Sequence, residues 1–315
     1  MTLPADLTEP VLAALDDPRV TGLVVLPGAA RQPTGDAVSF DVAREGATEL
    51  LARLEEVGVT EHGTLSLETV DAAPSRRAQS AEHEAFGAPD DGVVWPVVEE
   101  RATEGARRSW SFFVFLSLAT VLAAIAVVLD SSILVVGAMV LGPEFAPVMS
   151  VAVAIVLRRP VLARRALTLL VTGLAVAVVV TLVLSLLARS AGWVTLDDVL
   201  APRPQTDFIW HPDRWSFVVA VLAGIAGVLS LTSGRSNVLV GVFISVTTVP
   251  AAGNLGLGLA FLNESEISGS AAQLGLNLSG MLVAGVVTLL VQRWSGRVIG
   301  RRRSSRLRAT APAGS

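Results

Sequence analysis

The sequence places one carboxylate inside a long apolar run, and this residue is the first candidate for chemistry. Glu144 lies within residues 133–157, a run long enough to cross a bilayer. Gly142, Pro143 and Pro147 interrupt the run near its middle, since proline inside a helix removes a backbone hydrogen bond. A broken backbone and an ionisable group at that depth are tolerated where they are buried in protein or line a polar cavity. Glu144 is therefore a candidate carboxylate for a proton or a cation such as Na⁺.

A second apolar run, residues 238–262, contains a similar interruption near its centre. The polar and proline residues there, together with one amide of the last apolar run, are Thr247, Thr248, Pro250, Asn254 and Asn277. Unpaired backbone groups at two such breaks can bind an ion or a small polar solute without many charged side chains. The alternative is a pair of proline kinks relieved by neighbouring helices, with threonine hydroxyls bonding back to the chain. Two breaks together with Glu144 favour a binding site.

The composition is that of a membrane protein. Hydrophobic residues make up 52% of the 315 residues, charged residues 17%, and the mean hydropathy is +0.61. Soluble domains carry about a quarter charged residues. Cysteine is absent and the three histidines are far apart, so the sequence offers no metal cluster. Because no nucleophile with a base and no acid pair is evident, we expect neither an enzyme nor a cofactor beyond Na⁺ or H⁺ coupling.

Six apolar runs of spanning length follow a charged amino-terminal part. They are residues 110–129, 133–157, 167–187, 215–231, 238–262 and 271–292. Arginines gather on the side of the amino-terminal part, and the opposite loops are acidic, including Glu264 and Glu266. No basic and apolar leader opens the chain. We therefore expect both termini in the cytosol and the protein in the cytoplasmic (inner) membrane.

The two halves of the membrane region, residues 110–187 and 215–292, resemble each other. Trp110-Ser111-Phe112 recurs as Trp215-Ser216-Phe217, and residues 167–183 match residues 274–290 at nine of 17 positions, with Gly173 on Gly280. Because each half has three spans, the copies must lie in opposite orientations. Inverted three-helix repeats with broken second and fifth helices are typical of secondary transporters, whose sites form between the two breaks.

Residues 1–73 have the alternation of a small cytosolic α+β domain with the ferredoxin-like order β-α-β-β-α-β. The predicted strands are residues 1–3, 20–26, closed by Pro27-Gly28, 37–42 and 62–70, and the predicted helices are 8–17 and 48–57. The domain either binds a small regulatory ligand or only packs, and it lacks a nucleic-acid signature. A linker (74–92), a juxtamembrane helix (93–109) and a basic tail (293–315) complete the organisation.

The Val-Gly-Ala-Met run leading into Gly142-Pro143-Glu144, with the Trp-Ser-Phe opening, carries a family resemblance. The chain resembles a prokaryotic family of uncharacterised hydrophobic membrane proteins, a domain-of-unknown-function family, over most of its length. The resemblance implies a multi-span core, often behind a small cytosolic domain, but no substrate or catalytic residue. The resemblance also implies Ser-Pro in many relatives where this chain has Gly142-Pro143, and we then expect Glu144 to be a feature of one branch.

Three functions remain open on the sequence. The leading hypothesis is an ion-coupled secondary transporter of a small polar or ionic solute, with Glu144 as the titrating or cation-binding carboxylate. The second is a receptor or channel that is gated by a cytosolic small molecule through the amino-terminal domain. The third is a structural membrane scaffold. We also expect contact with membrane lipid and a homo-oligomer, because Gly275, Gly280 and Gly285 allow close helix contacts either within the chain or between subunits.

The orientation can be tested in this cysteine-free chain. Cysteines introduced one at a time at Ser190 and Ser304 should react oppositely with a membrane-impermeant thiol reagent. We expect Ser190→Cys to react in intact cells and Ser304→Cys to react only after permeabilisation. Reaction of both positions from outside would exclude six spans.

Overall fold

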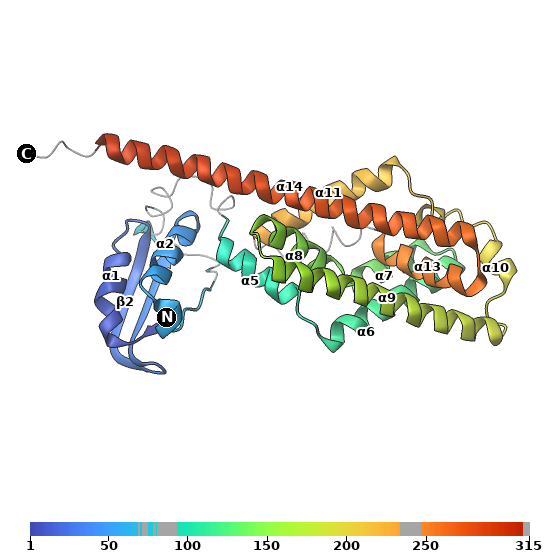
Figure 1. The fold of residues 1–315 in the computed structure, drawn as a ribbon, viewed down its shortest axis with the longest axis horizontal. Helices are drawn as coiled ribbons and strands as arrows, with labels where there is room; N and C mark the ends of the chain where they lie inside the picture. Colours follow the sequence, from blue (N-terminus) through green and yellow to red (C-terminus); the bar gives the residue numbers. More distant parts are fainter. Residues whose placement is uncertain (69, 71–74, 78–79, 81–92, 234–246, 311–315) are drawn as a thin grey trace, which may run out of the picture. The chain divides into compact units, whose positions relative to one another are not determined.

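The computed structural model describes residues 1–68, 70, 75–77, 80, 93–233 and 247–310, with side chains described as far as residue 295. Within this range the chain forms two compact units. One comprises Met1–Val97 with Ser295–Ser315, and the other is the helical unit Val98–Trp294. The helices and strands of both units are labelled in Figure 1.

The amino-terminal unit contains three strands, β1 (Thr2–Leu3), β2 (Val20–Arg31) and β3 (Thr34–Val42), in an antiparallel sheet of order β1-β3-β2. Helix α1 (Thr8–Ala14) connects β1 to β2, and α2 (Arg44–Glu56) follows β3, which is the predicted order from β1 to α2. The strand predicted over residues 62–70 is not formed in the described part of that segment. His62 instead ends the short helix α3 (Val59–His62), and a single antiparallel bridge joins Thr64 to Thr2.

Strand β2 is longer than the sequence predicts, because Pro27-Gly28 does not close it. The pairing of β2 with β3 shifts its register between Leu26 and Ala30. Gly28 takes the left-handed conformation (φ 66°), and its amide donates to the Asp36 carboxylate at 2.8 Å. This β-bulge accommodates the proline, so the strand continues to Arg31.

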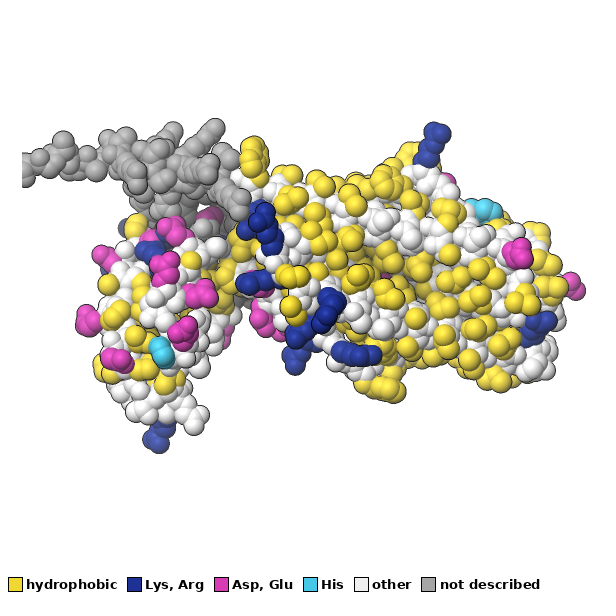
Figure 2. All heavy atoms as spheres, viewed as in Figure 1, with side chains coloured by type: hydrophobic (Ala, Val, Ile, Leu, Met, Phe, Trp, Pro, Cys, Tyr) yellow, Lys and Arg dark blue, Asp and Glu magenta, His cyan; other side chains and the backbone are white. Residues whose placement is uncertain are grey.

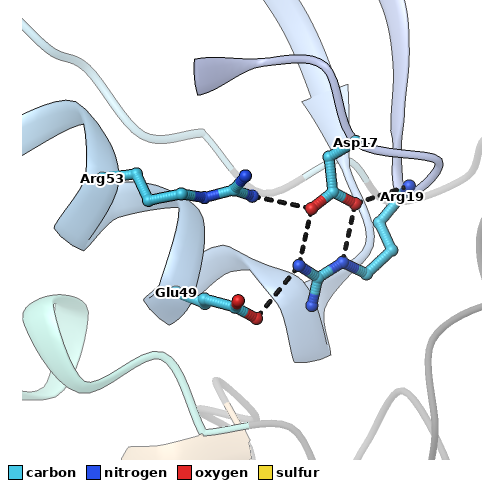
Figure 3. A network of polar contacts seen from close by, with 4 residues as sticks. All are labelled: Asp17, Arg19, Glu49 and Arg53. Atoms are coloured by element: carbon cyan, nitrogen blue, oxygen red, sulfur yellow. Dashed lines mark hydrogen bonds and ion pairs between the residues drawn. The ribbon is translucent and has the colours of Figure 1, made fainter. Parts of the chain in front are cut away.

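A network of ionised side chains lies beside the apolar core of this unit (Figure 3). Asp17 accepts hydrogen bonds from the guanidinium groups of Arg19 and Arg53, both at 2.6 Å, and Arg19 also reaches Glu49 at 3.0 Å. Arg19 is only 4% exposed and lies against α2, where Gly46 leaves room for its side chain. The hydrogen bonds from Arg19, followed by those from Arg53, hold the pKa of Asp17 well below its usual range despite burial.

The low pKa of Asp17 predicts how the stability of this unit depends on pH. The carboxylate is stabilised in the folded state, so its contribution is complete above the unfolded pKa of about 4 and is lost as pH falls further. In calorimetry of the full chain, Asp17→Asn should lower the unfolding temperature of this unit at pH 7 and flatten its decline below pH 4. The exposed neighbour Asp16, as Asp16→Asn, is the control. Equal pH profiles for wild type and Asp17→Asn would contradict the assignment.

The helical unit contains most of α5 (Trp95–Gly105), from Val98 on, and the part of α14 (Glu264–Thr310) as far as Trp294. Its other helices are α6 (Trp110–Val128), α7 (Ser132–Leu141), α8 (Phe145–Val156), α9 (Pro160–Ser190), α10 (Leu196–Leu200), α11 (Arg214–Ser233) and α13 (Thr248–Phe261). Four of them, α6, α9, α11 and residues Glu264–Ser295 of α14, are long and apolar enough to cross a membrane. Helices α7 and α8 are together also long and apolar enough, and their bend of 51° is that of a broken span or of a re-entrant loop. Apolar side chains cover much of the unit's surface, as in a membrane protein (Figure 2).

The last predicted run, residues 271–292, is part of α14, which begins earlier, at Glu264. Helix α13 corresponds to the second part of the fifth predicted run, residues 238–262. Residues 238–246 of that fifth run lie outside the described residues. Six spans and the inverted repeat therefore remain proposals. With 14 residues, α13 alone is too short to span a bilayer.

The two short helices α8 and α13 are the most buried elements of the unit, and small residues allow this close packing. A Cβ atom on Gly253 of α13 would meet Thr120 and Ala123 of α6, and one on Gly256 would meet Thr181 of α9. Helix α8 packs in the same manner against α11 and α14, where a Cβ on Gly227 would clash with the Phe145 ring. Backbones approach this closely only where the side chain is absent.

Arginines from the long helices bind the carboxyl ends of both short helices. Arg189 of α9 donates to the Ala260 carbonyl of α13 at 2.8 Å. Arg293 of α14 donates to the Val156 carbonyl of α8 at 2.5 Å. Each guanidinium satisfies a terminal carbonyl and places positive charge at the negative end of the helix dipole.

Candidate functional site

The predicted interruption of the second apolar run is present, and it separates α7 from α8. Gly142 ends α7 in an extended conformation, and α8 begins after Glu144. A Cβ atom on Gly142 would overlap both the Glu144 carboxylate and the Val249 side chain of α13. Glycine is therefore required by close approach, and the break lies directly against the first turn of α13.

The prolines begin the short helices and do not interrupt them. Pro147 is the third residue of α8, and Pro250 is the third residue of α13. An amide in the first turn has no partner within its own helix, so proline is tolerated there. The predicted break over residues 247–254 is wrong from Thr248 onward, because Thr248 to Asn254 are helical. The residues preceding Thr247 lie outside the described range.

Glu144 is buried at the junction between the two short helices. Its side chain is 7% exposed, and Oε2 has no hydrogen-bond partner among the described residues. It precedes the first turn of α8, where the helix dipole favours negative charge. A Cβ atom on Gly142 would meet both the Glu144 carboxylate and the Val249 side chain. Glu144 therefore lies close to the start of α13.

A row of buried polar side chains, here called the polar seam, joins the start of α13 to α14. Its buried members are Thr248 and Asn254 of α13 and Glu266, Ser270, Gln273 and Asn277 of α14, and it also includes the half-buried Thr247 directly before α13. The α14 members recur at spacings of four, three and four residues, which places them on one helical face. None of these four is more than 2% exposed. The seam is thus a polar stripe enclosed in an apolar helical unit.

Hydrogen bonds join members of the seam in two separate groups. The amides of Gln273 and Asn277 both donate to Thr247 Oγ1 at 2.9 Å, and the Asn254 amide donates to Ser270 Oγ at 2.9 Å. The oxygens Thr248 Oγ1, Asn254 Oδ1, Gln273 Oε1 and Glu266 Oε2 have no partner within the described part of the chain. Buried acceptors are rarely left without a partner.

The far end of the seam contains a buried ion pair. Arg203, from the segment between α9 and α11, pairs with Glu266, and the Asn263 amide donates to the same carboxylate oxygen at 3.2 Å. The sequence placed Glu266 in an acidic loop, and this is wrong, since the residue lies within α14 and is only 1% exposed. Trp210 of the same segment lies against Gly269, where a Cβ would meet its backbone carbonyl.

The structure brings some predicted residues together and adds others. Thr247 and Asn277 are hydrogen-bonded, Gly142 and Glu144 adjoin the start of α13, and Asn254 lies about two turns further along. Pro143 lies within the break, partly exposed. Sequence reasoning missed Gln273, Ser270, Glu266 and Arg203. The first three share with Asn277 a helical spacing that was readable in the sequence, whereas the position of Arg203 depends on loop folding.

The site offers oxygen ligands more than groups for covalent chemistry. Carboxylate, amide and hydroxyl oxygens are the ligands of hard cations such as Na⁺ and also bind solutes that donate hydrogen bonds. No group of three or more His, Cys, Asp or Glu that could hold a metal ion occurs among the described residues. Oxygen ligands of these types suit hard cations and hydrogen-bond-donating solutes better than transition metals that prefer thiolate or imidazole.

Parts of the chain are similar to a known protein family and to one curated protein. Residues 139–283, from α7 into α14, match the family model described as Domain of unknown function (DUF389). The predicted resemblance to an uncharacterised family is confirmed. An uncharacterized protein of Methanocaldococcus jannaschii is 26% identical over 198 residues, which cover 61% of this chain and 59% of that relative. No solved structure matches the chain.

The buried ion pair at the end of the seam predicts an asymmetric effect of substitution. Arg203→Leu leaves the Glu266 charge buried without its partner and should destabilise the protein by about 3–5 kcal/mol. Arg203→Leu combined with Glu266→Leu should recover much of that loss, since both charges are removed. The measurement is thermal unfolding of the purified protein. A double variant as unstable as Arg203→Leu would contradict the role of the pair.

Proposed function

We propose that this membrane protein is an ion-coupled secondary transporter of a small polar or ionic solute. The supporting observation is the set of buried oxygens without partners, on Glu144 at the break and on four seam residues. A buried acceptor left unpaired costs about 1–3 kcal/mol. A ligand that offers positive charge or hydrogen-bond donors offsets that cost, so the polar seam and the break are suited to bind one.

Each group has a defined role in the proposal. Glu144 is the titrating or cation-binding carboxylate, because it is buried at the start of α8 and adjoins α13. The neutral ligands are Thr247, Thr248, Asn254 and Asn277, and we add Gln273, because its Oε1 is buried without a partner among the described residues. Na⁺ or H⁺ is the coupling ion, since these oxygens are hard ligands.

Similar contacts in the two halves support six spans in an inverted repeat. Arg189 binds Ala260 and Arg293 binds Val156, although the two arginines are 104 residues apart and the aligned stretches of α9 and α14 are 107 apart. Each half thus binds the short helix of the other half. Such reciprocal contacts are those expected of an inverted repeat in a transporter.

Glycine contacts within each half add to this argument. A Cβ on Gly173 would meet Phe112, and a Cβ on Gly280 would lie near Phe217. These are the residues that the sequence comparison aligns. With six spans, both termini lie on one side, and the arginine distribution favours the cytosol in the cytoplasmic membrane.

Two other functions compete with transport. The receptor or channel hypothesis gains one observation, a shallow hollow of about 270 Å³ on the sheet of the amino-terminal unit, lined by apolar residues such as Val24, Leu26 and Val38. In a structural scaffold, water would form the missing hydrogen bonds of the polar seam, as it does for buried polar groups in many proteins.

A homo-oligomer is consistent with Gly275, which faces open space. Gly280 and Gly285 instead lie against residues of the same chain.

Ion-dependent stability tests the transport proposal. Purified wild type should unfold at higher temperature as Na⁺ is added or as pH is lowered, because a ligand that binds only the folded state stabilises it. A ligand at about 100 times its Kd contributes about 2.7 kcal/mol. Glu144→Gln keeps the size of the side chain but removes its charge and should lose this ion dependence. Thr248→Val should weaken the dependence by removing one oxygen.

The matched control is Thr288→Val on α14, where the hydroxyl only bonds to the Ala284 carbonyl of its own helix. This variant should retain the full ion response. Wild type with no response to Na⁺ or pH would overturn the ion-coupled mechanism and leave the receptor and the scaffold. Solute flux in proteoliposomes then separates a carrier from a receptor.

A further inference from the structure

A cavity of about 480 Å³ lies in the helical unit, away from the polar seam. It is formed by the end of α5, the residues before α6 and the first three turns of α9. The lining residues that carry the argument are Arg107, Arg108, Arg164, Arg165, Leu162 and Leu169. All of them belong to one compact unit.

The charge in this cavity is unbalanced. Four guanidinium groups line it, two from each side, and none of its lining residues is acidic. Within the described residues, none of the four forms an ion pair, although Arg108 lies 5.6 Å from the Phe113 ring. The nearby carboxylate of Glu99 pairs with Arg159, which is outside the cavity, at 2.7 Å. Arginine side chains (dark blue) gather over one part of this unit in Figure 2.

Arginine and threonine are suited to phosphate. The whole chain has no lysine, and the guanidinium fork matches two phosphate oxygens at once. The hydroxyls of Thr103, Thr168 and Thr172 also line the cavity and can donate to the same anion. The cavity thus has the donors for a phosphate ester.

The surroundings favour a lipid as the source of that phosphate. The cavity lies where the spans α6 and α9 begin, and Trp110 at the start of α6 is 83% exposed, as in an interfacial belt. In the same turns of α9 as the lining residues, Leu167 and Val171 are 51% and 57% exposed. An acyl chain can lie along this apolar surface while its headgroup occupies the cavity, whereas a soluble phosphate would use only the polar half.

We propose that this cavity binds the phosphate of an anionic phospholipid such as phosphatidylglycerol. The site is separate from the polar seam and does not depend on transport activity. Basic pockets between helices at the cytosolic side of a membrane are suited to such headgroups. Lipid bound there joins α5 to α9 and stabilises the cytosolic ends of the spans.

The test uses the purified full chain in phosphatidylcholine nanodiscs, with and without phosphatidylglycerol. Thermal unfolding should rise in temperature with phosphatidylglycerol, and native mass spectrometry should show the lipid retained. Arg164→Gln with Arg165→Gln should weaken retention about tenfold or more, because each arginine near a membrane surface contributes about 1 kcal/mol. Arg76→Gln with Arg77→Gln removes the same charge from exposed positions outside the cavity and should leave retention unchanged.

A second pair of variants, a crosslinking measurement and competition by soluble phosphates also test the proposal. Arg107→Gln with Arg108→Gln removes the opposite wall and should weaken retention similarly. In wild type, a photoreactive phosphatidylglycerol should crosslink to residues 101–109 or 160–172, a result that requires no variant. Crosslinks only elsewhere, or full retention by both pairs, would overturn the proposal. Inorganic phosphate or glycerol phosphate displacing the lipid and stabilising the protein equally would identify a site for a soluble anion instead.

Discussion

The helical unit depends on two helices that begin inside an apolar environment. The first amides of any helix have no partner within it, and a membrane interior offers no water to satisfy them. In α8 and α13 the third residue is proline, which removes one of these donors. The close approach of Gly142 to Val249 then brings the start of α13 against the break before α8. Polar groups are thereby gathered inside an apolar environment, where their burial costs free energy unless they are paired.

The two helix starts differ in chemistry although their prolines occupy the same position. Glu144 precedes α8 and Thr247 precedes α13, so a carboxylate stands at one and a hydroxyl at the other. Thr247 is held by the amides of Gln273 and Asn277, whereas Glu144 Oε2 has no partner in the described chain. The two helix starts therefore present a carboxylate oxygen without a partner and a hydroxyl that already accepts two hydrogen bonds.

The outer part of the structure holds this arrangement in place. Arg189 and Arg293 bind the carboxyl ends of the short helices, and the Arg203–Glu266 pair attaches the segment after α9 to α14. A buried ion pair contributes little net stability but is costly to break on one side. These arginines therefore restrict which arrangements of the helices are accessible. A carrier whose two halves move would have to exchange some of these contacts.

The sequence by itself determined the local features of this protein. Apolar runs of spanning length, the break at Gly142 to Glu144, and the order from β1 to α2 follow from residue type and periodicity, which act over a few residues. It misplaced the end of β2, because the bulge at Gly28 depends on the Asp36 carboxylate across the sheet. It also placed the second break among residues that are helical, because proline in a first turn looks the same in sequence as proline in a kink.

The tertiary structure alone decided which polar groups meet. Thr247 and Gln273 are 26 residues apart, and Arg203 and Glu266 are 63 apart. Periodicity places Gln273 and Glu266 on one face of α14, but only helix packing determines what that face contacts. Burial likewise depends on helix packing. Glutamate is typical of solvated loops, but Glu266 becomes part of the polar seam once α14 packs against α13. Contacts of this kind depend on the summed packing of distant helices, which no short stretch of sequence contains.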